Sequence, residues 1–387
     1  MKIAIIGANE YQNKLILKCK EKNIETHVFA WEDGAIGKEN ADFFYPVSII
    51  EKDIILEKCK EIGIDGVLSV GSDLAMLTVN YISDKMNLVG NTMLCTVLST
   101  NKYRMREAFL KNRVKSPKYC KVSGDKQYED ILLQLSLPVI VKPTDRSGSR
   151  GVTKVEKEDD LKFAIELALN ESFNKEIIVE EYIGGIEYSM EFFTDKGKHS
   201  FLAITEKFTT GSPHFIERAH LQPGTIGKEV LISAIDTAIK GLNALEIQDG
   251  ASHVEIKVQD KVPYIIEIGA RMGGDFIGSD LVKLSTGIDF TELVMDKALG
   301  NYTEIKRRWN KYSFVFFIFN LDDMITIKEN YSVLEPFIVE KELKESDGFA
   351  NVTDSSNRHG YIIFQFESYE EFKNIEKILL GVEENER

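Results

Sequence analysis

Apolar and polar residues alternate in two short segments of the chain, 253–257 and 265–271. Such alternation is typical of β-strands that bury one face and expose the other. A short polar connection around Lys261 predicts an antiparallel hairpin, with Glu255 opposite Glu267 on one face. Side chains return to a face at every second residue, so four further residues are expected there. They are His253, Lys257, Gly269 and Arg271.

The first hundred residues repeat a step from a helix-like stretch to an apolar, strand-like run. Residues 17–29 and 57–70, LKCKEKNIETHVF and EKCKEIGIDGVLSV, resemble each other in this respect. Together with the apolar run KIAIIG at 2–7, they predict a parallel βαβ domain over residues 1–100. A dinucleotide site at Ile3–Glu10 is an alternative for the first turn, but a full G-x-G-x-x-G is missing.

From Asn101 the pattern predicts a larger region that mixes helices with antiparallel strands. Helices are expected at 101–114, 161–173 and 230–245, and strands at 137–143, 177–183, 186–195 and 200–208. Beyond residue 300, strands are expected at 311–320 and 360–366 and a helix at 368–382. The fold class is therefore α/β and α+β, with an N-terminal βαβ domain (1–100), a central domain (101–300) and a small α+β C-terminal domain (301–387).

Composition narrows the class of protein. A chain of 387 residues with 43% hydrophobic and 28% charged residues predicts a globular protein of two or three domains. The net charge of −14 argues against a nucleic-acid partner, which needs a basic surface. The four cysteines show no C-x-x-C spacing, and no apolar run has the length of a signal peptide or membrane span. We therefore expect a cytoplasmic protein with no membrane partner.

Two segments carry candidate chemistry. Glu255 and Glu267 beside Arg271 suit a divalent metal that holds phosphate oxygens while the guanidinium takes developing charge. A surface hairpin with solvated charges is the alternative. The loop RSGSRG at 146–151 lets backbone N–H groups and serine hydroxyls approach an anion, and Lys142 precedes it. An ordinary glycine-rich turn with a flanking lysine is the alternative for this loop.

The order of these features resembles the ATP-grasp superfamily of carboxylate–amine ligases. The segments that carry the resemblance are VIVKPTDRSGSRGV (139–152), VEEYIGGIEYSMEF (179–192), HVEIKV (253–258) and IIEIGARMGG (265–274). The resemblance runs from about Asn101 to Leu299. It implies a pre-ATP-grasp βαβ domain over 1–100 and a two-lobed ATP-grasp domain over 101–300, with a mobile central lid at about 120–195.

The resemblance also implies roles for individual residues, with ATP and Mg²⁺ (or Mn²⁺) as cofactors. Lys102 and Lys142 would contact the phosphates, and Arg271 and Lys142 would be catalytic. The loop over the phosphates would include Ser147, Gly148, Ser149 and Gly151. Adenine would meet the hinge Glu180, Glu181, Tyr182 and Ile183, and Glu187 would accept the ribose hydroxyls. Glu255 and Glu267 would be the metal ligands. A solvated acidic pair is the alternative for Glu180 and Glu181.

One position departs from the family pattern. Many members carry Asn two residues after the second metal-binding Glu, where this chain has Gly269, which leaves the number of metal ions open. EIGAR, with KFTTGSPHFIERAHLQPG at 207–224, resembles the branch that joins L-amino acids into dipeptides. That branch implies substrate contacts by His214, Glu217, His220, Gly273 and Gly274. A structural histidine is the alternative for His214 and His220.

The resemblance implies a reaction in which the carboxylate of an amino acid is activated as an acyl phosphate and then joined to an amine. The partners are then a small-molecule carboxylate and amine, and a homodimer is compatible with the sequence. Two alternatives stay open. One is a purine-pathway ligase, such as a phosphoribosylamine–glycine ligase, for which Arg218, Lys257 and Lys283 could hold a phosphorylated ribose. The other is a nucleotide-binding module without turnover.

Overall fold

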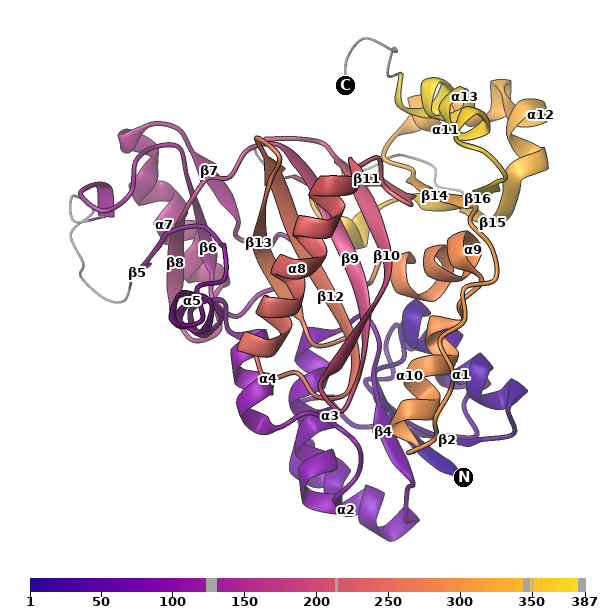
Figure 1. Ribbon diagram of the computed structural model, residues 1–387. Coiled ribbons are helices and arrows are strands. Elements are labelled where there is room, and N and C mark those ends of the chain that lie inside the picture. Colours follow the sequence, from indigo (N-terminus) through magenta and orange to yellow (C-terminus); the bar gives the residue numbers. More distant parts are fainter. Residues whose placement is uncertain (123–130, 213–214, 344–348, 350, 382–387) are drawn as a thin grey trace.

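The computed structural model describes residues 1–387 except 123–130, 213–214, 344–348, 350 and 382–387. In the described part of the chain, the strands form three sheets, one of eight strands and two of four (Figure 1). None of the helices found there combines the length and the apolar character that a bilayer crossing would need. The mixed α/β and α+β class expected from the sequence is confirmed.

The N-terminal sheet is parallel, with the strand order β3-β2-β1-β4. Its strands are β1 (Lys2–Ile6), β2 (Glu25–Ala30), β3 (Phe43–Pro46) and β4 (Gly66–Leu68). Helices α1 (Glu10–Glu21), α2 (Lys52–Ile62), α3 (Asp73–Met86) and α4 (Met93–Thr100) accompany them. The repeated Lys-Cys-Lys-Glu stretches place Cys19 and Cys59 in separate apolar clusters, with alternate residues of β1 in each. The predicted βαβ pattern is therefore present, and both faces of its sheet are buried.

The large sheet is antiparallel, with the order β13-β12-β9-β10-β11-β14-β16-β15. Five strands come from the centre of the chain: β9 (Ile186–Asp195), β10 (Lys198–Thr209), β11 (Glu217–Gln222), β12 (Gly250–Gln259) and β13 (Val262–Gly269). Helix α8 (Lys228–Ala244) lies against β12 and β13 and shares an apolar cluster with α5 (Lys102–Lys111) (Figure 1). The predicted helices at 101–114 and 230–245 thus share one core with the strands predicted at 186–195, 253–257 and 265–271.

The smaller antiparallel sheet has the order β5-β8-β6-β7 and lies at the left of Figure 1. Its strands are β5 (Tyr119–Val122), β6 (Val139–Pro143), β7 (Thr153–Val155) and β8 (Ile177–Glu181). Helix α7 (Leu161–Glu171) packs on one face, against alternate residues that include Val139, Val141 and Val179. The intervening residues, such as Lys142 and Glu180, therefore point to the opposite face.

The C-terminal strands continue the large sheet. Strand β14 (Tyr312–Phe317) pairs with β11, β16 (Gly360–Phe366) pairs with β14, and β15 (Ile338–Leu343) forms the edge. Helices α11 (Leu321–Glu329), α12 (Tyr331–Leu334) and α13 (Tyr369–Leu380) lie beside these strands (Figure 1). Three further helices connect β13 to this region: a π-helix at Ile277–Leu281, α9 (Val282–Thr286) and α10 (Phe290–Ala298).

Helix α13 should be held to the sheet mainly by Phe372. Its side chain is fully buried, and its ring lies 5.2 Å from that of Phe314 and 6.0 Å from that of Phe366. We expect Phe372→Ala to lower the free energy of unfolding by about 3–5 kcal/mol, because the change leaves a cavity. Phe163→Ala, at a side chain that is 69% exposed, should change it by about 0.5 kcal/mol or less. Urea unfolding of both variants checks this, and equal losses would contradict the packing argument.

Candidate functional site

A cleft with an empty volume of about 1080 Å³ lies between the small sheet and the β12–β13 hairpin, and is open to solvent at its mouth. Most of the residues singled out from the sequence line it: Lys102, Lys142, Ser147, Gly148, Ser149, Glu180, Glu181, Tyr182, Ile183, Glu187, Glu217, Glu255, Glu267 and Arg271. Gly151 lines a neighbouring groove instead. Three predicted residues, His220, Gly273 and Gly274, are not part of the lining of this cleft. His214 lies outside the described residues.

Lys142 and Glu180 line the cleft on the side of the small sheet. They lie on the same face because Ile140 pairs with Glu180, and Lys142 with Ile178, in the β6–β8 register. The Lys142 Nζ atom is 2.7 Å from Glu180 Oε2, and Arg106 Nε is 2.9 Å from Glu180 Oε1. Although burial alone would raise it, the cations Arg106 and Lys142 hold the pKa of Glu180 below its ordinary value. The carboxylate therefore fixes the position of the Lys142 ammonium.

Arg106 was not singled out from the sequence. It lies one helical turn after Lys102 in α5, and both side chains are buried. The spacing of four residues puts the two cations on one face of the helix, which was a usable signal. Besides Glu180, Arg106 donates to the carbonyl oxygen of Ile266 at 2.6 Å. It thus connects the small sheet to the metal-binding hairpin proposed from the sequence.

Lys102 connects the RSGSRG loop to the hairpin. The Asn101 side chain caps α5 by accepting the N–H of Arg104, so the helix begins at Lys102. The Lys102 ammonium donates to the carbonyl oxygen of Arg146 at 2.6 Å and to Glu267 Oε1 at 2.8 Å. Burial would lower the pKa of Lys102, but Glu267 outweighs it and the pKa is raised. The loop is therefore tied to the hairpin through a charged lysine.

The hairpin has the geometry expected from the sequence. Glu255 pairs with Glu267 across β12 and β13, and His253 pairs with Gly269. A bulge follows Glu255, but Lys257 still lines the cleft. Lys207 lies on β10, which β9 separates from β12 in the sheet. Its ammonium donates to Glu255 Oε1 at 3.0 Å and lies 2.9 Å from Glu187 Oε1. Each of the two facing glutamates thus has a lysine partner.

These two carboxylates fit a Mg²⁺ or Mn²⁺ ion. Both are oxygen donors at the cleft wall, the ligand type that Mg²⁺ prefers. Against the effect of burial, Lys207 and then His253 hold the pKa of Glu255 well below its ordinary value, so it is charged. No cluster of three or more acidic, histidine or cysteine side chains suited to a metal occurs among the described residues. Remaining ligands would therefore be water and phosphate oxygens, as is usual for Mg²⁺.

Arg271 follows the end of β13 and lines the same cleft. Its Nε and Nη2 atoms each donate to Asp73, at 2.9 Å, and Nη1 donates to the carbonyl oxygen of Met272 at 3.3 Å. The Asp73 carboxylate outweighs burial and raises the pKa of Arg271 above its ordinary value. The guanidinium is thus permanently charged and held on one side, as a stabiliser of phosphoryl charge should be.

Two of the residues predicted to contact substrate, His220 and Gly273, are held by contacts within the protein. His220 is fully buried, burial lowers its pKa, and its ring lies edge-on to Phe317 at 5.7 Å. The N–H of Gly273 donates to Glu191 Oε2 at 3.0 Å, and a Cβ at this position would come within 2.6 Å of Glu191 Oε1. Of this group, Glu217 alone is a cleft-lining residue among the described positions.

Arg358 is a further residue that the sequence did not indicate. It lies just before β16, and both Nη atoms donate to Asp275 Oδ2 at 2.9 Å. The same guanidinium lies 3.4 Å from Glu217 Oε2 and 3.8 Å from the centre of the Phe317 ring. Tyr11 of α1 donates to the other Asp275 oxygen at 2.9 Å. Both ends of the chain therefore contact Asp275, next to the predicted substrate residue Gly274, across separations that no local pattern reveals.

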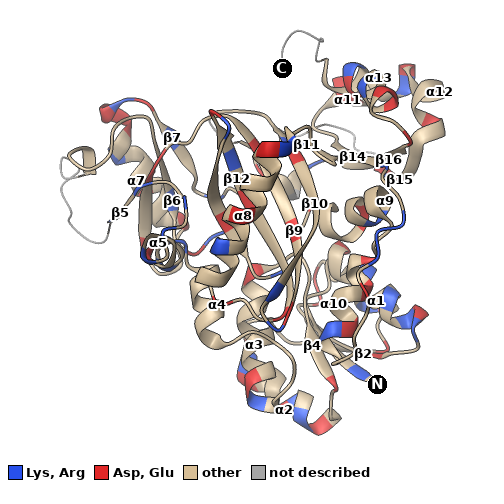
Figure 2. Cartoon of the chain, in the orientation of Figure 1, with Lys and Arg blue, Asp and Glu red and all other residues tan. Residues whose placement is uncertain are grey.

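Among the described residues, the cleft gathers six Lys and Arg residues and six glutamates, in a molecule that is acidic overall. Figure 2 shows Lys and Arg interspersed with Asp and Glu along the helices, and the chain as a whole carries a net charge of −14. Lys102, Lys142, Lys207, Lys257 and Arg271 nevertheless all line one cleft. A local group of cations of this kind can receive a polyanionic small molecule despite the overall sign.

Comparisons with known proteins identify the family of the chain. A profile described as ATP-grasp domain matches residues 135–280. The chain is 30% identical to D-alanine–D-alanine ligase of Geotalea uraniireducens over 218 residues, which cover 53% of this chain and 67% of that protein. It is 26% identical to alanine–anticapsin ligase of Bacillus subtilis over 295 residues, which cover 67% of this chain and 61% of that protein. The chain thus spans less than two thirds of the latter relative.

The fold is also that of solved structures. L-Amino acid ligase from Bacillus licheniformis superimposes with a TM-score of 0.80 and 22% identity, over 98% of this chain and 97% of that one. This chain therefore shares with that ligase a fold in which two antiparallel sheets border one cleft. The chain belongs to the ATP-grasp family.

Lys142→Ala should weaken ATP binding and slow turnover. The buried ammonium would be replaced by a cavity, and water there compensates phosphate charge poorly. Lys162→Ala, which removes an exposed charge from α7 on the other face of the same sheet, is the matched control. Calorimetric titration with ATP measures both. Unchanged affinity in Lys142→Ala would move the phosphate site elsewhere.

Glu267→Gln should abolish turnover, because it removes one charge from an oxygen-ligand site with little change in size. The Mg²⁺ concentration needed for half-maximal activity should rise for any activity that remains. Because Lys102 loses its charged partner in this variant, the unfolding midpoint must be measured alongside. Near-normal activity at saturating Mg²⁺ would contradict the metal assignment.

Proposed function

We propose that this protein is an ATP-dependent ligase that joins an amino-acid carboxylate to an amine through an acyl phosphate, releasing ADP and phosphate. One observation carries the proposal. The cleft brings Lys102, Lys142 and the RSGSRG loop against two facing glutamates and a fixed arginine. The names of the relatives add support, since alanine–anticapsin ligase and D-alanine–D-alanine ligase both act on alanine.

In the first step, a carboxylate oxygen of the substrate forms a bond to the γ-phosphorus of ATP, and the bond to the β-phosphate oxygen breaks. ADP leaves with the electron pair, and the product is an acyl phosphate. Lys102 and Lys142 counter the negative charge on the phosphates, and Arg271 takes up charge on the transferring group. A divalent ion held by Glu255 and Glu267 would supply further charge neutralisation.

In the second step, the amine nitrogen bonds to the acyl carbon, and phosphate leaves with the electron pair of the broken C–O bond. The nitrogen loses a proton, and an amide remains. Water must be excluded until the amine reacts, because it would hydrolyse the acyl phosphate. The RSGSRG loop is suited to closing over the phosphates. Gly148 and Gly151 have φ values of +68° and +69°, which other residues adopt at a cost.

The purine-pathway alternative is less well supported. Of the three cations suggested for a ribose phosphate, Lys257 lines the cleft. Arg218 is 2.7 Å from Asp323, and Lys283 is 2.9 Å from Asp289; neither is part of the cleft lining. A non-catalytic nucleotide-binding module would have no need for both facing glutamates and Arg271.

The experiment is an ADP-release screen over pairs of amino acids, with phosphoribosylamine plus glycine as one arm. We expect ADP release that depends on both an amino-acid carboxylate and an amine, with formation of the amide confirmed by mass spectrometry. Release that required phosphoribosylamine would favour the alternative. ATP binding without release under any pair would favour the non-catalytic module.

Arg271→Lys separates binding from chemistry. Lysine keeps the charge but cannot hold two oxygens in the plane of a guanidinium. We expect ATP affinity to be retained, because Lys102 and Lys142 still face the phosphates, while turnover falls by on the order of 10²-fold or more. Calorimetry and a coupled ADP assay measure the two quantities. A parallel loss of both would make Arg271 a ground-state ligand only.

A further inference from the structure

The partner of Arg271 comes from a distant part of the chain. Asp73 is the first residue of α3 in the N-terminal domain, 198 positions before Arg271. Two parallel bonds of 2.9 Å join its carboxylate to Nε and Nη2 of the guanidinium. Such a fork fixes both the position and the plane of an arginine. The orientation of Arg271 is therefore set from outside the hairpin that carries it.

Gly269 provides the space for this fork. A Cβ atom at position 269 would lie 2.9 Å from Asp73 Oδ1 and 3.2 Å from Arg271 Nε. Both contacts are shorter than a carbon atom normally tolerates next to these groups. A side chain such as the Asn of other family members would have to displace the carboxylate. The absence of a side chain at Gly269 thus leaves room for the Asp73 carboxylate beside Arg271.

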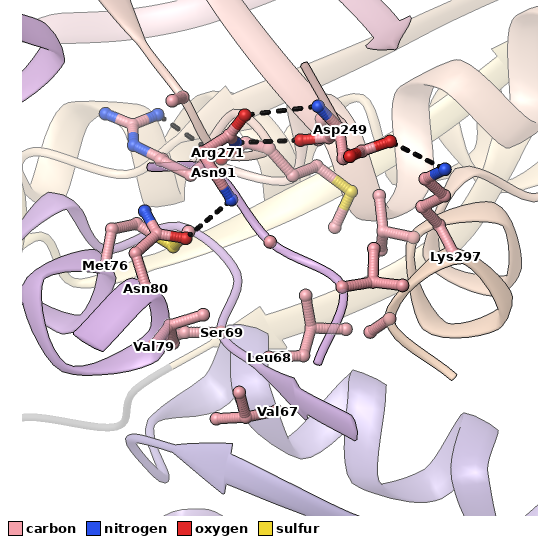
Figure 3. Close-up of a pocket in the computed structure, with 18 of the residues that line it drawn as sticks. Val67, Leu68, Ser69, Met76, Val79, Asn80, Asn91, Asp249, Arg271 and Lys297 are labelled. Carbon is pink, nitrogen blue, oxygen red and sulfur yellow. Dashed lines mark hydrogen bonds and ion pairs between the residues drawn. The ribbon is translucent and has the colours of Figure 1, made fainter. Parts of the chain in front are cut away.

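A second set of bonds holds the N-terminal domain in place beside the hairpin. Asn91 donates to the carbonyl oxygen of Asp249 at 2.8 Å and accepts the N–H of the same residue at 3.1 Å. Figure 3 shows these bonds at one end of a small pocket that Arg271 also lines. The N–H of Asn91 in turn donates to Asn80 of α3 at 3.2 Å. Helix α3 therefore cannot shift relative to β12 without breaking these hydrogen bonds of Asn91.

We propose that Asp73 is a positioning residue for the reaction, holding the Arg271 guanidinium so that its other N–H groups face the transferring phosphoryl group. This inference rests on the proposed function for the role of Arg271. The Nε–H and one N–H of Nη2 point to Asp73, and Nη1 bonds Met272. Each terminal nitrogen then keeps one more N–H for oxygen atoms in the cleft. Without Asp73, the guanidinium would rotate about its side-chain torsions.

The test uses Asp73→Asn, which keeps the shape of the side chain but removes its charge and one acceptor. We expect kcat for ADP release to fall by about 10- to 100-fold, the scale of misplacing a reactive group by about 1 Å. ATP affinity should stay close to that of the wild type, while the unfolding midpoint falls because Arg271 loses its charged partner. Asp195→Asn is the control, because it breaks an ion pair with Lys297 outside the cleft. The control should retain full activity.

Two more variants separate positioning from a merely structural role. Gly269→Ala alters neither charged residue, yet its Cβ should push the fork apart and lower kcat in the same way. The double variant Asp73→Asn with Arg271→Lys should be no slower than Arg271→Lys alone, because the two residues act as one unit. Additive losses in the double variant, or wild-type kcat in Asp73→Asn, would overturn the proposal.

A measurement without substrate keeps this inference separate from the proposed function. The Nε–H group of Arg271 should give a signal in the ¹H–¹⁵N correlation spectrum, and its proton should exchange slowly with water. The signal is assigned by its absence in Arg271→Lys. In Asp73→Asn we expect the signal to shift and to exchange at least about 10-fold faster, on the scale of one lost charge-assisted bond. An unchanged signal would overturn the positioning role. Absence of ligase activity with a changed signal would count against the proposed function alone.

Discussion

The site depends on two glutamates that face each other across one hairpin. Like charges directly opposite in a sheet are destabilising, so the pairing of Glu255 with Glu267 must be compensated. Lys207 from β10 compensates Glu255, and Lys102 from α5 compensates Glu267. Lys102 in turn holds the loop at Arg146. Helix α5, strand β10 and the loop therefore all take part in balancing the charge of this pair of glutamates.

The same pairing of opposite charges compensates the lysines of the cleft. Each lysine that would meet a phosphate is already paired with a carboxylate: Lys102 with Glu267 and Lys142 with Glu180. In the proposed reaction, phosphate oxygens would compete for the Lys102 ammonium, and Glu267 would then be free to hold a divalent ion. The number of satisfied charges changes little during that exchange. Each of these buried ions would then keep a partner of opposite charge, whereas an unpaired buried ion costs several kcal/mol.

The sequence could predict the elements whose patterns are local. Alternation in 253–257 and 265–271 was enough for the Glu255–Glu267 pairing. Strand β11 escaped notice because Glu217–Gln222 is polar, although it is central to the large sheet and joins the C-terminal strands to it. Asp73 and Arg358 escaped for a different reason. Their partners lie 198 and 83 positions away, and only the packed fold brings an isolated acid or arginine to its counterpart.

The two halves of the site consequently differ in what holds them. The half that we propose binds the nucleotide is built from β6, β8, α5 and the hairpin, whose residues lie within one central stretch of the chain. The loop after the hairpin is held from both ends: Asp73 and Tyr11 reach it from the N-terminal domain, and Arg358 from the C-terminal strands. Asp275 and Phe276 have φ values of +48° and +63°, unfavourable for residues with side chains. Such a backbone persists only where its surroundings impose it. Changes in either terminal region should therefore act on the cleft through this loop, at Arg271 and Asp275, and leave the contacts among β6, β8 and α5 intact.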